Sequence, residues 1–284
     1  MNKFSQDWLQ LREPTDVASR NKSVLAACAS AFEGRESLAI CDLGSGTGAS
    51  VQAFAELLPA KQSWTLVDHD AENLASALVA LAEWSDTAAL CAAGIELRRG
   101  NKYIQVQTLQ LDLSAHPKCW PDSTELVTAS ALLDLTSGRW MKDLAMALRS
   151  RGLPLLATLT FDGLIQCEPH HDHDRAVRES FNLHQNRDKG FGPAAGASAA
   201  HAIEQEMTKL GYDLTAGDSA WFLDRQSSSQ LLDETLNGIA NAVFETGLLE
   251  PSEITQWRRS HTGEIKSLTV GHRDFFARLG KDQG

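Results

Sequence analysis

The sequence predicts an α/β fold in which a mostly parallel, doubly wound sheet is covered by helices on both faces. Short apolar stretches of strand length alternate with longer stretches of helical periodicity. The first two strands end in acids, and a glycine-rich turn joins the first strand to the helix that follows. Such alternation implies right-handed crossovers and a parallel sheet. Ligands of open sheets bind in the crevice at the carboxyl ends of the strands.

The expected elements follow this pattern along the chain. Helical spacing of apolar residues predicts a first helix over residues 7–33, and the alanine-rich segment 74–94 is expected to be packed helix. Strands are expected at 37–44, 64–70, 104–114, 125–135 and 153–163, with helices at 49–58, 71–84 and 138–152 between them. Beyond Gly163, helices are expected at 173–185, 199–211, 228–246 and 252–261, and strands at 212–223 and 267–276.

Charge and cysteine content exclude several classes of protein. The formal net charge is −11, and an acidic surface disfavours binding to nucleic acid, so a small-molecule substrate is expected. Five cysteines, odd in number and far apart, suggest neither a disulfide framework nor a zinc ribbon. The first residues are too polar for a signal peptide, and no apolar segment is long enough to span a bilayer. We therefore expect a cytoplasmic protein without a membrane partner.

The stretch "AICDLGSGTGAS", residues 39–50, contains the motif on which the functional interpretation depends. Gly44, Gly46 and Ala49 satisfy the pattern G-x-G-x-x-G/A, and Asp68 ends the next strand, where a carboxylate can bind ribose hydroxyls. Glycine turns of this kind are also common for packing reasons. Asp42 discriminates between ligands, because a carboxylate beside a pyrophosphate is electrostatically unfavourable, whereas it suits a ligand with a cationic group.

Three consecutive motifs, "DLGSGTG", "LVDHD" and "LQLDLS", resemble the cofactor motifs of class I S-adenosylmethionine-dependent methyltransferases. The resemblance covers residues 38–160, and the stretches "YDLTAGDSAWFL" and "SLTVGHRDFF" resemble the strand pair that closes the sheet of that family. It implies a Rossmann-like methyltransferase fold, with a mostly parallel seven-stranded sheet and an antiparallel closing strand. It also implies S-adenosylmethionine as the cofactor.

The resemblance assigns cofactor contacts to individual residues. The residues under the methionine and ribose portions are Asp42, Gly44, Ser45, Gly46 and Gly48. Asp68 takes the ribose hydroxyls with His69 beside the adenine, Asp112 and the backbone N–H of Leu113 read the adenine, and Ser130 and Ala131 face the methionine arm. Two alternatives remain open. Asp112 and Asp68 can simply cap the turns after their strands, and the methionine carboxylate can be bound by Arg20 or Arg12, or by neither if both are solvated.

One domain, residues 1–284, is expected, with four parts. Residues 1–37 form an N-terminal helical cap, 38–162 the cofactor-binding core, 163–198 an inserted lid-like segment, and 199–284 complete the sheet. The helices within 228–261 are expected to cover the sheet, although the same surface can line a homodimer interface.

Candidates for the methyl-transfer step come from the chain beyond the cofactor motifs. Methyl transfer mainly requires that the acceptor, the methyl group and the sulfur are aligned and that water is excluded. A general base is needed only for an acceptor that arrives protonated. "ASALLD" lacks the prolines and aromatic residue of adenine and amide N-methyltransferases, and no Asp-Asn pair suggests a catechol-type metal enzyme. We expect His184 as a base, Asp134 to orient the acceptor, and Lys189 to contact it. The alternatives are a structural His184 at a helix end and an Asp134 that caps the helix starting near Ser137.

The histidine-rich stretch "EPHHDHD", residues 168–174, offers several metal-ligand types. Adjacent residues cannot all converge on one ion, so a polar loop without a metal is expected. Two rival functions remain. One is an NAD(P)-dependent oxidoreductase built on the same glycine turn, and the other is a non-catalytic protein that binds the nucleoside.

Overall fold

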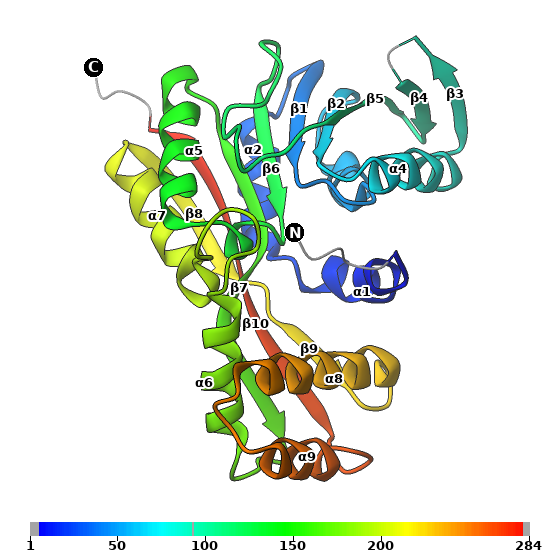
Figure 1. Ribbon diagram of the computed structural model, residues 1–284. Helices are drawn as coiled ribbons and strands as arrows, with labels where there is room; N and C mark the ends of the chain where they lie inside the picture. Colours follow the sequence, from blue (N-terminus) through cyan, green and yellow to red (C-terminus); the bar gives the residue numbers. More distant parts are fainter. Residues whose placement is uncertain (1–5, 93, 281–284) are drawn as a thin grey trace.

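The computed structural model describes residues 6–92 and 94–280, and within them ten strands form one mixed sheet (Figure 1). The order of neighbouring strands is β3-β4-β5-β2-β1-β6-β7-β10-β8, and β9 pairs with β10 beside this path. The five strands from β5 to β7 are parallel, whereas β10 runs antiparallel to β7, β8 and β9. The bounds are β1 Ser37–Leu43, β2 Lys61–Asp68, β3 Thr87–Cys91, β4 Gly94–Arg99, β5 Lys102–Gln110, β6 Leu126–Ser130, β7 Leu155–Glu168, β8 Tyr212–Asp218, β9 Trp221–Asp224 and β10 Ser267–Leu279.

Seven of these strands, from β5 to β8 in the sheet order, form the doubly wound, mostly parallel arrangement expected from the sequence, with β10 as the antiparallel closing strand. The expected strand 212–223 is in fact two strands, β8 and β9. The helix expected up to residue 94 is wrong beyond Trp84, because β3 and β4 form a hairpin that extends the sheet edge. A Cβ on Gly94 would lie 2.1 Å from the carbonyl oxygen of Val106, so glycine permits this close strand approach.

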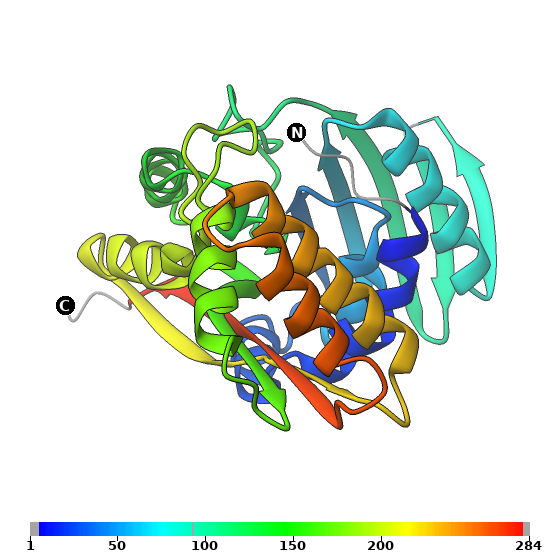
Figure 2. The ribbon, with the colours of Figure 1, turned by 60° about the horizontal axis from the view of Figure 1, so that its bottom comes forward.

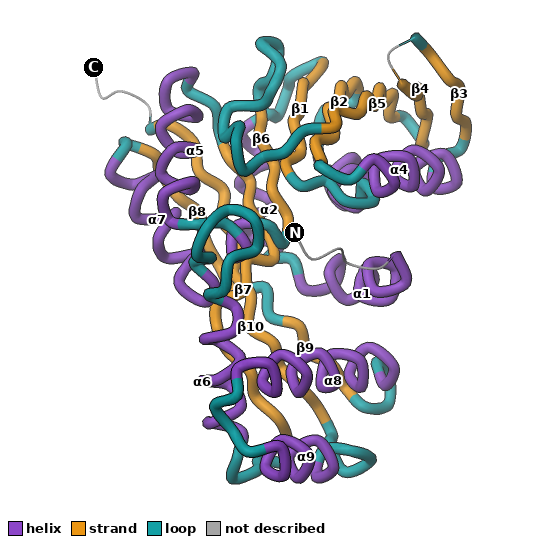
Figure 3. Tube along the Cα trace, in the orientation of Figure 1, coloured by secondary structure: helices purple, strands orange, loops and turns teal. Residues whose placement is uncertain are grey.

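Helices cover both faces of the sheet (Figure 3). Helices α2, α3 and α4 pack on one face against apolar side chains such as Ile40 and Trp64. Helices α5 and α7 pack on the other face, where Leu43 and Val127 lie. The bounds are α1 Gln6–Ser19, α2 Lys22–Ala31, α3 Ala49–Phe54, α4 Ala71–Trp84, α5 Gly138–Arg151, α6 Asp174–Gln185, α7 Ala199–Lys209, α8 Ser229–Thr246 and α9 Pro251–Ser260.

Helices α6, α8 and α9 form a separate group, here called the helical lobe (Figure 2). The lobe packs against the C-terminal half of β7, the first residues of β10, and β9. Val177 of α6, Leu232 of α8 and Trp257 of α9 are buried in its apolar core. The expected boundary at residue 163 falls inside β7, which continues to Glu168. The lobe therefore combines part of the expected lid-like segment with part of the expected sheet-completing segment.

The helix expected over residues 7–33 is broken at Arg20 and Asn21, and a buried carboxylate stabilises the break. Asn21 caps α2 by accepting hydrogen bonds from the backbone N–H groups of Ser23 and Val24. Its own N–H donates to Oδ2 of Asp274 at 2.8 Å, while the N–H of Leu159 donates to Oδ1 at 2.7 Å. Asp274 thus joins the N-terminal cap to the centre of the sheet.

None of the helices in the described parts of the chain combines the length and apolarity needed to cross a lipid bilayer.

We expect Asp274→Ala to lower the free energy of unfolding by about 3–5 kcal/mol, because it strands two buried N–H groups and removes a negative charge near Arg20. Urea denaturation followed by circular dichroism measures the effect. Asp218→Ala is the matched control: this exposed carboxylate accepts from Arg273 at 3.3 Å on the surface, and its loss should cost less than about 1 kcal/mol. Equal losses in both variants would contradict the anchoring role of Asp274.

Candidate functional site

A cavity of about 910 Å³ opens at the carboxyl ends of β1, β2, β6 and β7, between the glycine-rich turn, α1 and the helical lobe. Its volume lies at the upper end of the range of roughly 300–1,000 Å³ typical of small-molecule sites. The lining residues fall into two groups. One group comprises Arg20 and residues at the ends of β1, β2, β5 and β6. The other comprises Asp134 after β6, residues of α1, α6, α8 and the loop after α6, and side chains of β7, β9 and β10. We call the first the nucleoside end and the second the lobe end.

The glycine-rich turn forms the floor of the nucleoside end. Gly44, Gly46 and Gly48 have positive φ angles of 65°, 51° and 81°, a region that L side chains rarely adopt. A Cβ on Gly44 would also lie 3.0 Å from Leu132, so this position has little room for a side chain. The turn is held to the next strand by the N–H of Gly46, which donates to Oδ2 of Asp68 at 2.9 Å.

Asp42 lies beneath this turn, is buried, and is not itself among the residues that line the cavity. Its Oδ1 accepts a hydrogen bond from the hydroxyl of Thr128 at 2.5 Å. Oδ2 has no hydrogen-bond partner of good geometry among the described residues, although the Ser50 hydroxyl is near enough to stabilise the carboxylate. Burial raises the pKa of Asp42 to about 7, against the lowering effect of the Thr128 and Ser50 hydroxyls and of Arg20. An ionised Asp42 therefore lacks full compensation until a further donor or cation approaches.

Arg20 lines the same end of the cavity from the break between α1 and α2. It is buried, its guanidinium lies over the ring of Phe54, and its Nε and Nη1 atoms have no hydrogen-bond partner among the described residues. Burial lowers its pKa, while the charges of Asp16, Asp274 and Asp42 raise it. The alternative that Arg20 is a solvated surface residue is therefore wrong. Arg12 also lines the cavity, but its Nε is bound to Asp16 at 3.1 Å.

Most of the other residues expected to contact the nucleoside line the cavity, but Asp112 does not. Asp68, His69, Leu113 and Ser130 line the cavity together with Ser45. Asp68 is buried, and its Oδ1 accepts from the N–H of Asp70 at 2.9 Å, which is the turn-capping alternative. The same oxygen lies 3.1 Å from Nδ1 of His69, and the ribose contact of Asp68 stays a prediction. Asp112 is exposed and is not among the lining residues. Its Oδ1 accepts from the N–H of Ser114 at 2.9 Å, which is the turn-capping alternative, so its adenine contact stays a prediction.

Asp134 projects to the lobe end from the short turn after β6. Its Oδ1 is buried without a partner among the described residues, and burial raises its pKa to about 6, against the lowering effect of nearby backbone N–H groups, Arg12 and Lys189. The alternative that Asp134 caps the following helix is wrong, because the hydroxyl of Ser137 accepts from the N–H of Trp140 there. A carboxylate with a vacant acceptor thus faces the cavity.

His184 lines the lobe end from the last turn of α6. Its Nε2 lies 3.0 Å from Oε2 of Glu245 on α8, which is the structural contact considered as the alternative role. Its Nδ1 is buried and has no partner within the described chain. Both features occur together, so the pairing with Glu245 orients a ring whose other nitrogen is available. Lys189 also lines the cavity, and partial burial lowers its pKa.

The sequence analysis missed His272 and the two phenylalanines, Phe161 and Phe181, in the aromatic wall of the lobe end. His272 of β10 lies beside Phe161 and Trp221, with ring centroids 6.3 and 5.0 Å away, and Phe161 also contacts Phe181 edge to face. Burial lowers the pKa of His272 to about 3, so the imidazole is neutral, and its Nδ1 has no partner among the described residues. The signal that could have found it is a histidine inside the otherwise apolar closing strand "SLTVGHRDFF".

The strand order and the two-part cavity define the chain as a doubly wound α/β protein with a ligand site at the topological switch of its sheet. No protein-family model matches the sequence, and no curated protein matches it.

Several solved structures are similar to this chain. A SAM-dependent methyltransferase from Thiobacillus denitrificans, in complex with S-adenosylhomocysteine, is 15% identical with a TM-score of 0.46, and the match covers 99% of this chain and 100% of that one. A cyclopropane synthase from Mycobacterium tuberculosis is 12% identical with a TM-score of 0.49, covering 97% and 94%. A phosphoethanolamine N-methyltransferase from Haemonchus contortus is 15% identical with a TM-score of 0.47, covering 96% of this chain and 57% of that one. At such low identity, the function has to be judged from the side chains of the site.

We expect Asp42→Asn to stabilise the ligand-free protein, and to do so more at pH 8 than at pH 5. Burial raises the pKa of the Asp42 carboxyl from 3.8 to about 7 in the folded protein. The wild-type protein therefore loses stability as the pH rises from about 4 to about 7, because the unfolded chain ionises this carboxyl before the folded protein does. The difference in gain between the two pH values should be on the order of 2 kcal/mol, measured by urea denaturation.

Asp112→Asn is the control of opposite sign. Hydrogen bonds from the hydroxyl and backbone N–H of Ser114 lower the pKa of this exposed carboxyl, so its removal should cost a little stability at pH 8. A loss of stability in Asp42→Asn at pH 8 would mean that the Asp42 charge is already compensated without a ligand.

Proposed function

We propose that the protein is an S-adenosylmethionine-dependent methyltransferase acting on a small molecule. The observation that carries this proposal is the pair of unpartnered opposite charges at the glycine turn. Arg20 lines the cavity and has two buried, unpartnered nitrogens, and Asp42 lies beneath the turn with one buried carboxylate oxygen that lacks a partner of good geometry. The methionine portion of the cofactor is a zwitterion whose carboxylate suits the guanidinium and whose ammonium suits the carboxylate. Asp68, beside the same turn, suits the ribose hydroxyls.

A dinucleotide fits this end less well. A pyrophosphate on the turn would meet Asp42 and Asp68, and burial strengthens the repulsion between like charges. Asp16 and Asp274 add further negative charge next to Arg20. The oxidoreductase alternative therefore requires an anion to enter a region rich in carboxylates.

The lobe end supports an acceptor with an apolar or aromatic body and a polar reacting group. Phe161, Phe181 and Trp221 provide an apolar wall. Asp134, His184 and His272 line the same region, and each has a buried atom without a hydrogen-bond partner among the described residues. Such a site aligns the acceptor with the methyl group and excludes water, which are the main requirements of in-line transfer. His184 takes the proton of the acceptor through Nδ1, Asp134 accepts a hydrogen bond from it, and Lys189 contacts its polar periphery.

We expect S-adenosylhomocysteine to bind at least tenfold more tightly than NADH in isothermal titration calorimetry, because its zwitterion matches Arg20 and Asp42.

Arg20→Lys should weaken binding of S-adenosylhomocysteine about tenfold, since the ammonium keeps the charge but loses the two-donor geometry.

Arg12→Gln is the matched control, because Arg12 already pairs with Asp16, and it should change the affinity less than twofold. A stronger effect at Arg12 would transfer the carboxylate contact to that residue. Tighter binding of NADH than of S-adenosylhomocysteine would overturn the methyltransferase proposal.

We expect His184→Ala to lower the turnover of S-adenosylmethionine, assayed with a pool of small metabolites, by about 10²–10⁴-fold, while affinity for S-adenosylhomocysteine stays within about twofold. Asp134→Asn should behave in the same way with a smaller loss. His201→Ala, on the exposed side of α7, should leave both quantities unchanged. Unchanged turnover in His184→Ala would reduce this histidine to its structural contact with Glu245.

A further inference from the structure

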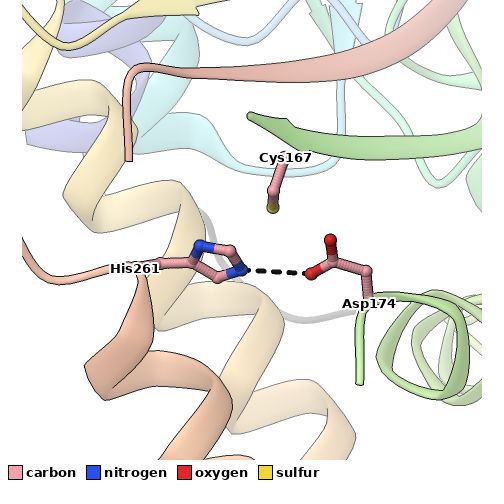
Figure 4. A group of neighbouring side chains, drawn as sticks. All are labelled: Cys167, Asp174 and His261. Carbon is pink, nitrogen blue, oxygen red and sulfur yellow. Dashed lines mark hydrogen bonds and ion pairs between the residues drawn. The ribbon is translucent and has the colours of Figure 1, made fainter. Parts of the chain in front are cut away.

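Three potential metal ligands meet in the helical lobe, outside the cavity described above (Figure 4). Cys167 is the second-last residue of β7, Asp174 begins α6, and His261 follows the last residue of α9. One atom from each, the thiol sulfur, a carboxylate oxygen and an imidazole nitrogen, lies within 4.8 Å of the other two. Cys167 and His261 are 3% and 2% exposed, so the group is buried.

We propose that Cys167, Asp174 and His261 bind one divalent zinc ion. Tetrahedral zinc places the atoms of mixed sulfur, nitrogen and oxygen ligands roughly 3.5 Å apart. Oδ1 of Asp174 and Nε2 of His261 are 3.0 Å apart, and the sulfur lies within reach of both. Small side-chain rotations therefore convert the observed cluster into a coordination shell without movement of the backbone.

The donor types favour zinc over harder or softer cations. A thiolate, an imidazole and a carboxylate together suit borderline zinc, whereas magnesium and calcium prefer oxygen alone. Two anionic ligands and a neutral imidazole balance the charge of a dication, which makes burial of the complex favourable. The fourth position goes to water or to His170, whose Nδ1 lies 2.9 Å from Oδ2 of Asp174.

The surrounding hydrogen bonds hold Asp174 in place for this role. Trp257 donates from Nε1 to Oδ1 at 2.8 Å, and the backbone N–H of His171 donates to Oδ2 at 2.8 Å. Outer partners of this kind orient metal-binding carboxylates and raise metal affinity. Without metal, the same carboxylate serves as a hydrogen-bond acceptor for His261, so a metal-free network is the competing outcome.

The histidine-rich stretch now has a different interpretation from the metal-free loop expected earlier. Its adjacent residues do not converge, but Asp174 meets ligands supplied by positions 167 and 261. The ion would join β7, α6 and α9, the three elements that close the outer end of the lobe. Its binding energy would therefore stabilise the lobe on the sheet.

The test loads the full-length protein with zinc sulfate, removes unbound metal by gel filtration, and measures metal content by plasma mass spectrometry. We expect about one zinc per chain in the wild type and at least a tenfold lower content in Cys167→Ser and His261→Gln. Cys119→Ser, a buried cysteine in another part of the core, is the matched control and should retain full occupancy. Circular dichroism establishes that each variant is folded.

A second measurement needs no loss-of-ligand variant. Cobalt(II) bound to the wild type and to Cys119→Ser should give the charge-transfer absorption of a thiolate ligand. Absence of that band, or wild-type zinc content below about 0.1 per chain, would overturn the proposal. Retention of zinc in a folded Cys167→Ser would also overturn it, by placing the ion on the exposed histidines instead.

Discussion

The electrostatic interaction of the buried Arg20 guanidinium with Asp16, Asp42 and Asp274 is the constraint that links the fold to the site. These acids come from α1, β1 and β10, which are far apart in the sequence, so one charge cluster fixes the helical cap against the central and closing strands. Burial of ions is favourable only when their charges and hydrogen bonds are largely compensated. Arg20 and Asp42 keep unpartnered atoms, and this remaining imbalance is what a zwitterionic ligand can remove.

The two ends of the cavity are built from different parts of the fold. The nucleoside end belongs to turns between adjacent parallel strands, where backbone geometry sets the position of each group. The lobe end combines side chains from α1, α6, α8, β7 and β10, and the contact of His184 with Glu245 joins two helices of the lobe across it. Under the proposed function, the cofactor binds at the first end and the acceptor at the second.

The sequence predicted the strands and turns that surround the nucleoside end because their signals are local, whereas the cofactor contacts of the individual residues stay predictions. Periodicity located β1, β2 and α4, and Asp42, the glycines and Asp68 lie within 27 residues of one another. The hairpin of β3 and β4 was not predicted because its alanines favour a helix in isolation. Pairing of β4 with β5 stabilises the strand conformation instead. His272 and Glu245 escaped because their roles depend on partners at distant positions, such as Phe161 and His184, which no local pattern connects.

Helix α6 physically connects the two chemical regions of the lobe. Asp174 is its first residue and His184 lies in its last turn, about 15 Å further along at 1.5 Å per residue. The ends of the helix are fixed separately, the first by His261 and Trp257 and the second by Glu245. The buried cluster and the lobe end of the cavity thus share one helix whose two ends have different partners, although the two sites have no residue in common.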